Sequence, residues 1–120
     1  MEANPYAVYN GIRVASASTE SVEIYTDLKK ELTNIYGMAH GGLLATLLDN
    51  CGGLTVRLDG NRYVTLDMNI CYLANVKEGR ITAKSEVVKR GKNVTVMRVK
   101  ATAEDGKLLA EATVTFFRIG

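Results

Sequence analysis

The chain has 120 residues, of which 47% are hydrophobic and 23% charged, as is typical of a globular protein with one hydrophobic core. This length predicts a single domain over residues 1–120. The formal net charge of +2, with no clustered basic stripe, argues against nucleic acid as a partner.

The cysteines, the single histidine and the length of the apolar runs further narrow the class of protein. Cys51 and Cys71 lie inside apolar segments and are predicted to be small core residues in a reducing compartment. No secretory signal is visible, and no apolar run reaches the ~20 residues of a membrane span, so we expect a cytoplasmic protein without membrane segments. With one histidine and no cluster of Cys or His, no metal site is predicted.

The first 39 residues predict a short helix, two strands and a loop. Residues 5–10 fit one short helical turn. Apolar and polar residues then alternate on both sides of residues 18–20, which predicts two strands joined there. The alternating apolar positions are Ile12, Val14, Val22 and Ile24. Residues 28–32 are a short charged linker, and residues 33–39 form the loop before the next element.

A long helix is predicted from Gly41 to Leu58, because this stretch is nearly all apolar or small and contains no proline. At the α-helical rise it is roughly 27 Å long, about the width of a small domain. A helix of this composition must be buried on most of its circumference, so the rest of the chain has to wrap around it.

Asp49 is a carboxylate in the middle of this apolar helix. Its neighbours three and four positions away are all small: Ala45, Thr46, Gly52 and Gly53. Each glycine costs a helix interior about 1 kcal/mol relative to alanine, which indicates that space is kept beside the carboxylate. We predict a reactive carboxylate facing a groove. The alternative is a buried carboxylate held by a structural hydrogen bond.

The helix begins at His40-Gly41-Gly42, without the Ser, Thr or Asp that usually caps the first N–H groups. Free N–H groups at a helix start attract oxygen atoms that carry negative charge, and glycines let a ligand approach the backbone. This composition suits an oxyanion hole. The alternative is a tight turn packed against a neighbouring strand.

The spacing between these two features predicts an assembly. Gly41 and Asp49 are about 12 Å apart along a helix axis, so one reacting carbonyl cannot lie ~3 Å from both in the same chain. If both act on one atom, one of them comes from a second copy. Two antiparallel helices about a two-fold axis would achieve this, which predicts a homodimer with two shared sites.

Four strands are predicted after a turn at residues 59–61. Residues 64–72 have the clearest period of two in the chain. One face carries Val64, Leu66, Met68, Ile70 and Tyr72, and the other carries Thr65, Asp67, Asn69 and Cys71. The further strands are 81–89, 94–104 and 108–117, and the turns between them are 90–93 and 105–106. In the strand 94–104, one face carries Thr95, Met97, Val99 and Ala101. The fold class is therefore α+β, with a curved antiparallel sheet of five to six strands wrapped around one long central helix.

Several spaced motifs together carry a family resemblance. They are Asn34, His40-Gly41-Gly42, Asp49, residues 64–72 and residues 89–92. In this order and spacing the chain resembles the hotdog-fold acyl-CoA thioesterases of the PaaI type, in the 4-hydroxybenzoyl-CoA thioesterase superfamily, from about residue 11 to residue 117. The resemblance implies the hotdog fold, dimers commonly paired into tetramers, and active sites across the dimer interface.

The resemblance also implies roles for single residues. Asp49 matches the catalytic carboxylate, which acts as general base or as nucleophile, and the Gly41 N–H matches the group that polarises the thioester carbonyl from the partner chain. Asn34 matches an amide that orients water or thioester; its alternative is a turn residue. Thr65 matches a hydroxyl that assists the carboxylate, and an ordinary strand threonine is the alternative. His40 is expected to support the turn and the substrate.

Binding of coenzyme A (CoA) is assigned by the same resemblance. The candidates are Gly42, Tyr72, Lys89, Arg90, Gly91, Lys92, Asn93 and Val94. By composition alone the segment 89–93 is an ordinary solvated turn, although three cations and a glycine also suit phosphate oxygens. For Tyr72 the alternative is a tyrosine in the core or on the sheet face.

The expected activity is hydrolysis of an aromatic or medium-chain acyl-CoA thioester, with no metal or bound cofactor. The acyl group is left open, since Tyr36, Met38, Leu44 and Leu48 could line either an aromatic or an aliphatic pocket. The alternatives are a hotdog enoyl-CoA hydratase or dehydratase, and a non-catalytic module that binds acyl-CoA. The hydratase is disfavoured because the only histidine is at the helix start.

Overall fold

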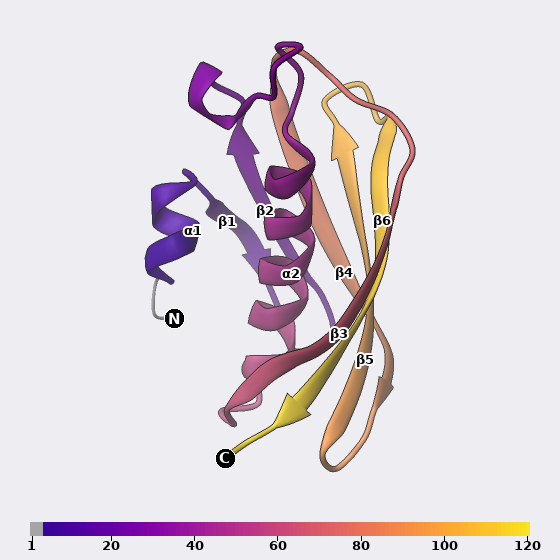
Figure 1. Cartoon of the computed structure of the whole chain (residues 1–120). Coiled ribbons are helices and arrows are strands. Elements are labelled where there is room, and N and C mark those ends of the chain that lie inside the picture. The colour runs from indigo at the N-terminus through magenta and orange to yellow at the C-terminus, as the bar shows by residue number, and fades with distance from the viewer. Residues whose placement is uncertain (1–3) are drawn as a thin grey trace.

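The computed structural model describes residues 4–120 and consists of one antiparallel sheet, one long helix and two short helical segments. The elements are α1 (Pro5–Tyr9), β1 (Arg13–Ala17), β2 (Val22–Asp27), the 3₁₀ helix η1 (Lys30–Leu32), α2 (Gly41–Arg57), β3 (Tyr63–Tyr72), β4 (Arg80–Arg90), β5 (Val94–Ala103) and β6 (Leu108–Arg118). The strand order is β1-β2-β4-β5-β6-β3, with every neighbouring pair antiparallel (Figure 1). The predicted α+β hotdog architecture is confirmed.

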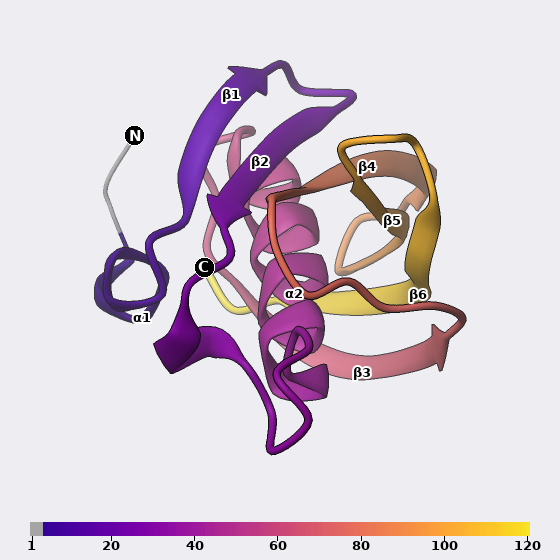
Figure 2. The same ribbon diagram turned by 90° about the horizontal axis from the view of Figure 1, so that it is seen from above.

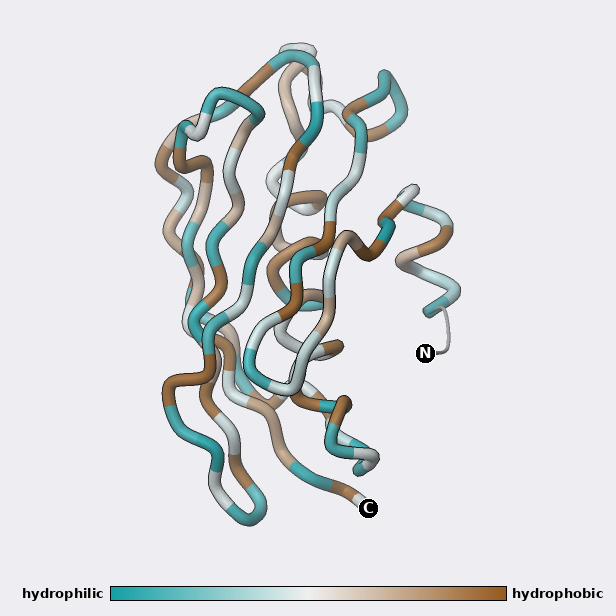
Figure 3. The backbone as a smooth tube through the Cα atoms, turned by 180° about the vertical axis from the view of Figure 1, so that it is seen from behind, coloured by the Kyte–Doolittle hydropathy of each residue, from teal (hydrophilic) through white to brown (hydrophobic). Residues whose placement is uncertain are grey.

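The core lies between α2 and the concave face of the sheet, which curves around the helix (Figure 2). Apolar positions of α2 at helical spacing are buried here; they are Leu43, Leu44, Leu47, Leu48 and Cys51. From β5 the face predicted to be apolar is wholly buried, and hydropathy alternates along the strands as a period of two requires (Figure 3). The sheet covers only part of the helix circumference, so α2 keeps an uncovered side.

The alternation predicted for β3 is interrupted by a bulge. Thr65 pairs with Phe116 and Asp67 pairs with Thr115, so Leu66 is the extra residue between them. The predicted grouping of Val64 and Leu66 with the later apolar positions is therefore wrong, and Thr65 faces α2. A period of two cannot reveal a bulge, because the extra residue changes the phase without changing the composition.

Two local expectations are corrected. Cys51 is buried as predicted, where it donates to the carbonyl of Val22 at 3.1 Å, and burial raises the pKa of its thiol to about 12. Cys71 is exposed rather than in the core, because it pairs with Glu111 on the outer face of the sheet, which no element among residues 4–120 covers at this point. The helix α2 ends one residue earlier than predicted, and the linker at 28–32 contains the 3₁₀ turn η1.

Candidate active site

Asp49 lies at the middle of α2 on the uncovered side of the helix, half-buried rather than enclosed in the core. The hydroxyl of Thr65 donates to its Oδ1 at 2.7 Å, across from β3. Among residues 4–120, Oδ2 has no hydrogen-bond donor. The carboxylate is thus oriented by one contact from the bulge of β3 and keeps one oxygen free for other chemistry.

The two glycines next to Asp49 have a different role from the predicted one. A Cβ at Gly52 would lie 3.0 Å from Cε2 of Phe116, and one at Gly53 would lie 3.7 Å from Cε1 of the same ring. Gly52 therefore lets the Phe116 ring pack directly against the helix backbone, whereas a Cβ at Gly53 would make only ordinary contact with the ring and would lie nearest to Nη1 of Arg57, at 3.2 Å. The space beside Asp49 instead exists because the sheet does not extend over this side of α2 within residues 4–120.

The start of α2 is capped by His40, which the sequence did not predict. Its Nδ1 accepts the N–H of Gly42 at 2.8 Å, and its carbonyl accepts from Leu43 and Leu44 at 2.9 and 3.2 Å. Of the first N–H groups of the helix, only that of Gly41 has no acceptor among residues 4–120. The predicted cluster of free donors is therefore reduced to a single one.

Tyr72 lies beside this free N–H group. Its hydroxyl donates to the carbonyl of Gly41 at 3.3 Å, and its ring Cε1 is 3.6 Å from where a Cβ at Gly41 would be. The side chain is 55% exposed, so it covers only one side of the helix start. The end of β3 thereby packs against the start of α2, and the predicted residues Gly41, Gly42, His40 and Tyr72 are brought together.

Asn34 closes the loop before α2. Its Oδ1 accepts the N–H groups of Tyr36 and Met38 at 2.9 and 3.1 Å, and Gly37 takes a positive φ of 74° in this turn. The alternative of a turn residue is therefore observed. Its Nδ2 amide has no acceptor among residues 4–120, so the same side chain keeps donors to offer. Ile35 at the tip is 90% exposed.

The turn between β4 and β5 lies at the end of the molecule opposite the start of α2 (Figure 1). Arg90 pairs with Asp59 at 3.2 Å, whereas Lys89 and Lys92 are exposed. At Gly91 a Cβ would collide with the carbonyl of Val94, so only glycine fits this turn. Within residues 4–120 the turn thus offers two cations without a partner, and it is remote from Gly41 in the same chain.

Asp59 itself is held in a structural network. Burial tends to raise its pKa, but hydrogen bonds from Tyr63 and Asn61 and the charge of Arg90 outweigh burial, so the pKa of Asp59 is lowered. Tyr63 donates to Oδ2 at 2.6 Å, and the resulting interaction raises the pKa of Tyr63. This carboxylate joins the end of α2 to the turn of β4–β5.

Two of the four predicted acyl-pocket residues are in the wrong place for that role. Leu44 and Leu48 are buried against the sheet, because they lie on the covered side of α2. A hollow of about 200 Å³ lies instead between α1, η1 and the start of α2. It is lined by Tyr6, Asn10, Glu31, Leu32, Thr33, His40, Gly42, Leu43 and Thr46. Tyr6 was not predicted to lie here, since only the fold brings it next to His40, 34 positions later in the chain.

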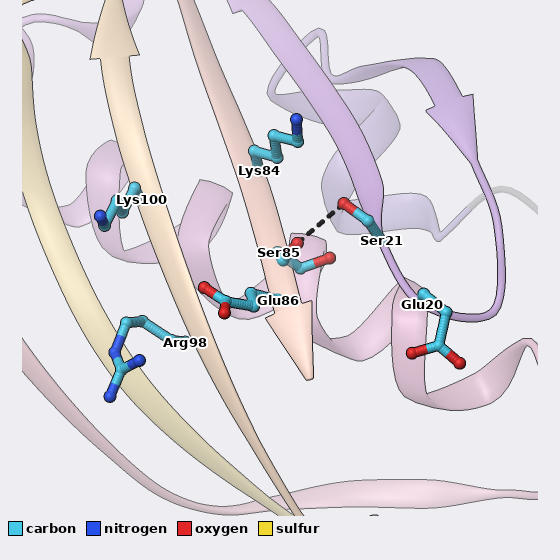
Figure 4. A pocket seen from close by; sticks show the side chains of 7 residues that line it. All are labelled: Glu20, Ser21, Lys84, Ser85, Glu86, Arg98 and Lys100. Carbon is cyan, nitrogen blue, oxygen red and sulfur yellow. Dashed lines mark hydrogen bonds between the residues drawn. The ribbon is translucent and has the colours of Figure 1, made fainter. Parts of the chain in front are cut away.

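A second hollow, of about 290 Å³, lies on the outer face of the sheet (Figure 4). Lys84 stands opposite Lys100, and Glu86 stands opposite Arg98, on neighbouring strands. The helix α2 and Asp49 are on the other face, so this hollow belongs to a solvated, charged surface outside the candidate site.

Within residues 4–120, no three His, Cys, Asp or Glu side chains gather closely enough to hold a metal ion. No helix in that range is both long and apolar enough to cross a membrane.

Comparison with known proteins identifies the class. The family model of the thioesterase superfamily matches residues 36–110. Human acyl-coenzyme A thioesterase 13 is 35% identical over 112 residues, which cover 90% of this chain and 80% of that protein. The chain belongs to the thioesterase superfamily, as a hotdog-fold member of the PaaI type. The predicted enzyme class, a thioester hydrolase, is confirmed.

Solved structures agree with this assignment. The Escherichia coli PaaI protein from the phenylacetic acid degradation operon superposes with a TM-score of 0.94 over 98% of this chain and 86% of that one; at 23% identity it shows the fold. A hypothetical thioesterase of Streptococcus pneumoniae, solved with coenzyme A, is 35% identical, with a TM-score of 0.87 over 91% and 86% of the two chains. That protein has also been solved with an aspartate or a threonine replaced by alanine, at positions 16 residues apart.

Proposed function

We propose that this protein hydrolyses an aromatic or medium-chain acyl-CoA thioester to the free acid and CoA. The observation that carries the proposal is the pair of Asp49 and Thr65, 2.7 Å apart on the uncovered side of α2, with one carboxylate oxygen left free. The spacing of 16 residues between them equals that between the substituted aspartate and threonine of the S. pneumoniae protein. Similarity to human acyl-coenzyme A thioesterase 13 supports the substrate class.

In this mechanism Asp49 acts on the thioester carbonyl either through a water molecule, as general base, or directly, as nucleophile. Attack at the carbonyl carbon places negative charge on the carbonyl oxygen, which the N–H of Gly41 stabilises. The C–S bond then breaks and CoA leaves. In the general-base route the proton that Asp49 took from water passes to the sulfur, and the free acid forms directly. In the nucleophile route CoA leaves as the thiolate, and water hydrolyses the anhydride between Asp49 and the acyl group, which supplies the proton for the thiol and releases the acid. The free amide of Asn34 orients the water or the thioester, and Thr65 holds the carboxylate in place. No metal or bound cofactor takes part.

The Gly41 that serves each Asp49 comes from a partner chain in this proposal. Within one α2 the two residues are about 12 Å apart along the axis. The uncovered side of the helix carries the small residues Gly42, Ala45 and Thr46, which would let a second helix approach closely. The edge strand β3 and its end expose apolar side chains that a partner would cover, such as Leu66 at 61% and Leu73 at 57%. Pairing of such dimers into a tetramer, and a cytoplasmic location, remain predictions.

The turn between β4 and β5 is the proposed site for the CoA phosphates, with Lys89 and Lys92 as its uncommitted cations. Arg90 contributes less in this proposal, because Asp59 already neutralises it at 3.2 Å. Gly91 and Asn93 shape the turn, and the Asn93 carbonyl accepts from Arg118 at 2.7 Å. Because the turn is far from Gly41 of its own chain, a CoA molecule here would reach the helix start of the partner.

The alternative reactions are tested by what the protein does to a CoA ester. A hydratase would need a histidine with a carboxylate for proton transfer, and the single His40 already uses Nδ1 to cap α2. Incubation with a panel of aromatic and aliphatic acyl-CoAs, with thiol release as the readout, should show hydrolysis of at least one class. Binding of acyl-CoA without thiol release would support the non-catalytic module, and hydration of an enoyl-CoA would support the hydratase.

A mixing experiment tests the shared site. Gly41 is the first residue of α2 and His40 has φ −65° and ψ 137°, so Gly41→Pro removes the N–H without disturbing the helix. The matched control Gly41→Ala keeps the N–H, and its Cβ makes ordinary contact with Tyr72. Inactive Gly41→Pro and inactive Asp49→Asn chains, refolded together at equal amounts, should regain about one quarter of wild-type activity. No recovery in demonstrated mixed dimers would place both groups in one chain.

A further inference from the structure

The backbone of His40 is fixed from both sides. Its N–H donates to the carbonyl of Leu32 at 3.1 Å, and its carbonyl accepts the first turn of α2. The preceding Ala39 is held by the β3–β4 connection, since its N–H donates to Val76 at 2.9 Å and its carbonyl accepts from Asn75 at 3.0 Å. The backbone that carries the imidazole is therefore held in place, although the side chain itself is exposed.

Gly42 is needed for the ring to reach its position. A Cβ at Gly42 would lie 3.0 Å from Nδ1 and 3.3 Å from Cε1 of His40, closer than nearly all such contacts in proteins. The edge of the ring that carries Nδ1 and Cε1 thus lies close against Gly42, and Nδ1 accepts the Gly42 N–H at 2.8 Å. The carbonyl of Gly42 is also occupied, because Thr46 donates to it at 2.8 Å. Both backbone polar groups of Gly42 are therefore committed, and Gly41 alone keeps a free N–H among residues 4–120.

We propose that His40 is a positioning residue: as the neutral tautomer protonated on Nε2, it caps Gly42 through Nδ1 and so holds the N–H of Gly41 in place as the single free donor. This inference rests on the proposed function, in which that N–H binds the thioester oxygen. A nitrogen that accepts a hydrogen bond carries no proton, so the cap fixes the tautomer. His40 then acts on the reaction through the backbone, without touching the substrate.

The cap has a consequence for pH. When the imidazole takes up a second proton, Nδ1 becomes a donor, faces the Gly42 N–H and can no longer accept from it. The charged and titratable groups around the ring are Lys30 and Glu31 from η1, Tyr6 from α1, and Tyr72 from β3 through its contact with Gly41. Asp49 lies further along α2. Protonation of His40 should therefore release the cap and lower kcat, in addition to the loss that protonation of Asp49 causes.

The test compares His40→Ala, which loses the cap, with His40→Asn, whose side-chain oxygen can cap in the same place without titrating. We expect His40→Ala to lower kcat about ten- to hundredfold with little change in KM, since a misplaced donor costs about that much. His40→Asn should recover most of this loss, and its kcat should fall less than that of the wild type when the pH is lowered, because only Asp49 is then left to lose its charge. Gly42→Ala, which displaces the ring, should resemble His40→Ala. A His40→Ala enzyme with full kcat would overturn the proposal.

A nitrogen NMR measurement separates this inference from the activity. In the wild type at neutral pH, Nδ1 of His40 should be unprotonated, and the Gly42 amide should exchange slowly with solvent; exchange should speed up in His40→Ala and not in His40→Asn. A protonated Nδ1, or equal exchange in all three, would contradict the cap. A protected Gly42 amide in an inactive His40→Asn would instead assign the imidazole to the substrate. Absence of thiol release from the wild type would reject the proposed function and the positioning role together, while the amide data still decide whether the cap exists.

Discussion

The two sides of α2 have opposite character, and they determine different properties of the protein. The covered side carries leucines that are 0–5% exposed and pack on the concave sheet. The uncovered side carries Gly42, Ala45, Thr46 and Asp49, none of which is buried. Substitution on the first side should change stability and leave the chemistry intact, whereas substitution on the second should change chemistry or assembly and leave the fold intact.

Asp49→Asn provides the strongest test of this division. The amide keeps the shape and the contact with Thr65 but can neither take a proton nor attack a carbonyl, so turnover should fall by about 10²–10⁴-fold. The melting temperature should stay close to that of the wild type, because the side chain is half-buried and has one hydrogen bond to the rest of residues 4–120. Thiol release and thermal unfolding measure the two effects. Full turnover in Asp49→Asn and Asp49→Ala would remove this carboxylate from the mechanism.

Leu47→Ala is the matching substitution on the covered side. Leu47 is 0% exposed, and truncation of a buried leucine costs about 2–5 kcal/mol of unfolding free energy. Urea titration should show this loss, while kcat of the molecules that remain folded should stay within about twofold of the wild type. A large loss of kcat at a concentration and temperature where the chain is folded would show that the two sides are coupled.

Strands with uninterrupted alternation were predictable from the sequence, whereas the bulge that shifts the alternation in β3 was not. Thr95, Met97, Val99 and Ala101 alternate over uninterrupted pairing, so sequence alone assigned their buried face correctly. In β3 the bulge at Leu66 reversed the phase, and nothing in the local composition signals it. The register of β3 against β6 decides that Thr65 faces α2, which is a long-range property.

The candidate site was predictable to a similar degree. Asp49 and Gly41 stand out because each breaks the pattern of an apolar helix. The structure places Asp49 on the uncovered side of the helix, and it leaves the N–H of Gly41 free among residues 4–120. Two details could not be read from the chain. The ring of Phe116 explains Gly52 from 64 positions away, and the Nδ1 of His40 caps a helix that had no usual capping residue.

Thr65→Val should have a smaller effect than Asp49→Asn. Valine keeps the volume and the strand preference, but it removes the hydroxyl that holds Oδ1 of Asp49 at 2.7 Å. Loss of one orienting hydrogen bond of about 1.4 kcal/mol corresponds to roughly a tenfold lower kcat. Thr65→Ser is the control, since it keeps the donor and should recover most of the rate. Equal rates for the valine and serine variants would make Thr65 an ordinary strand residue.

Asp59 supplies the smallest and most local test, because it is the structural counterpart of Asp49. In the part of the chain that the structure describes, three donors hold it, from Tyr63, Asn61 and Arg90, whereas a single donor holds Asp49. The pKa of Asp59 is lowered on folding, so its contribution to stability is complete above the pKa of the unfolded state, near 3.9, and is lost as pH falls through the lower folded value. Asp59→Asn should therefore lower the free energy of unfolding at neutral pH, by up to about 1 kcal/mol for a partly exposed network, and the difference from the wild type should shrink in acid.

Asp27 is the control for this last prediction, because its pKa is lowered by the hydrogen bond and charge of Arg80, but both side chains are exposed. Asp27→Asn should change the urea midpoint less than Asp59→Asn, and added salt should remove what difference there is. Neither variant should change kcat, since neither carboxylate faces the uncovered side of α2. A loss of kcat in Asp59→Asn, with stability unchanged, would mean that the network at the end of α2 also positions the proposed CoA turn. Asp59 could then no longer be separated from Asp49 as a purely structural carboxylate.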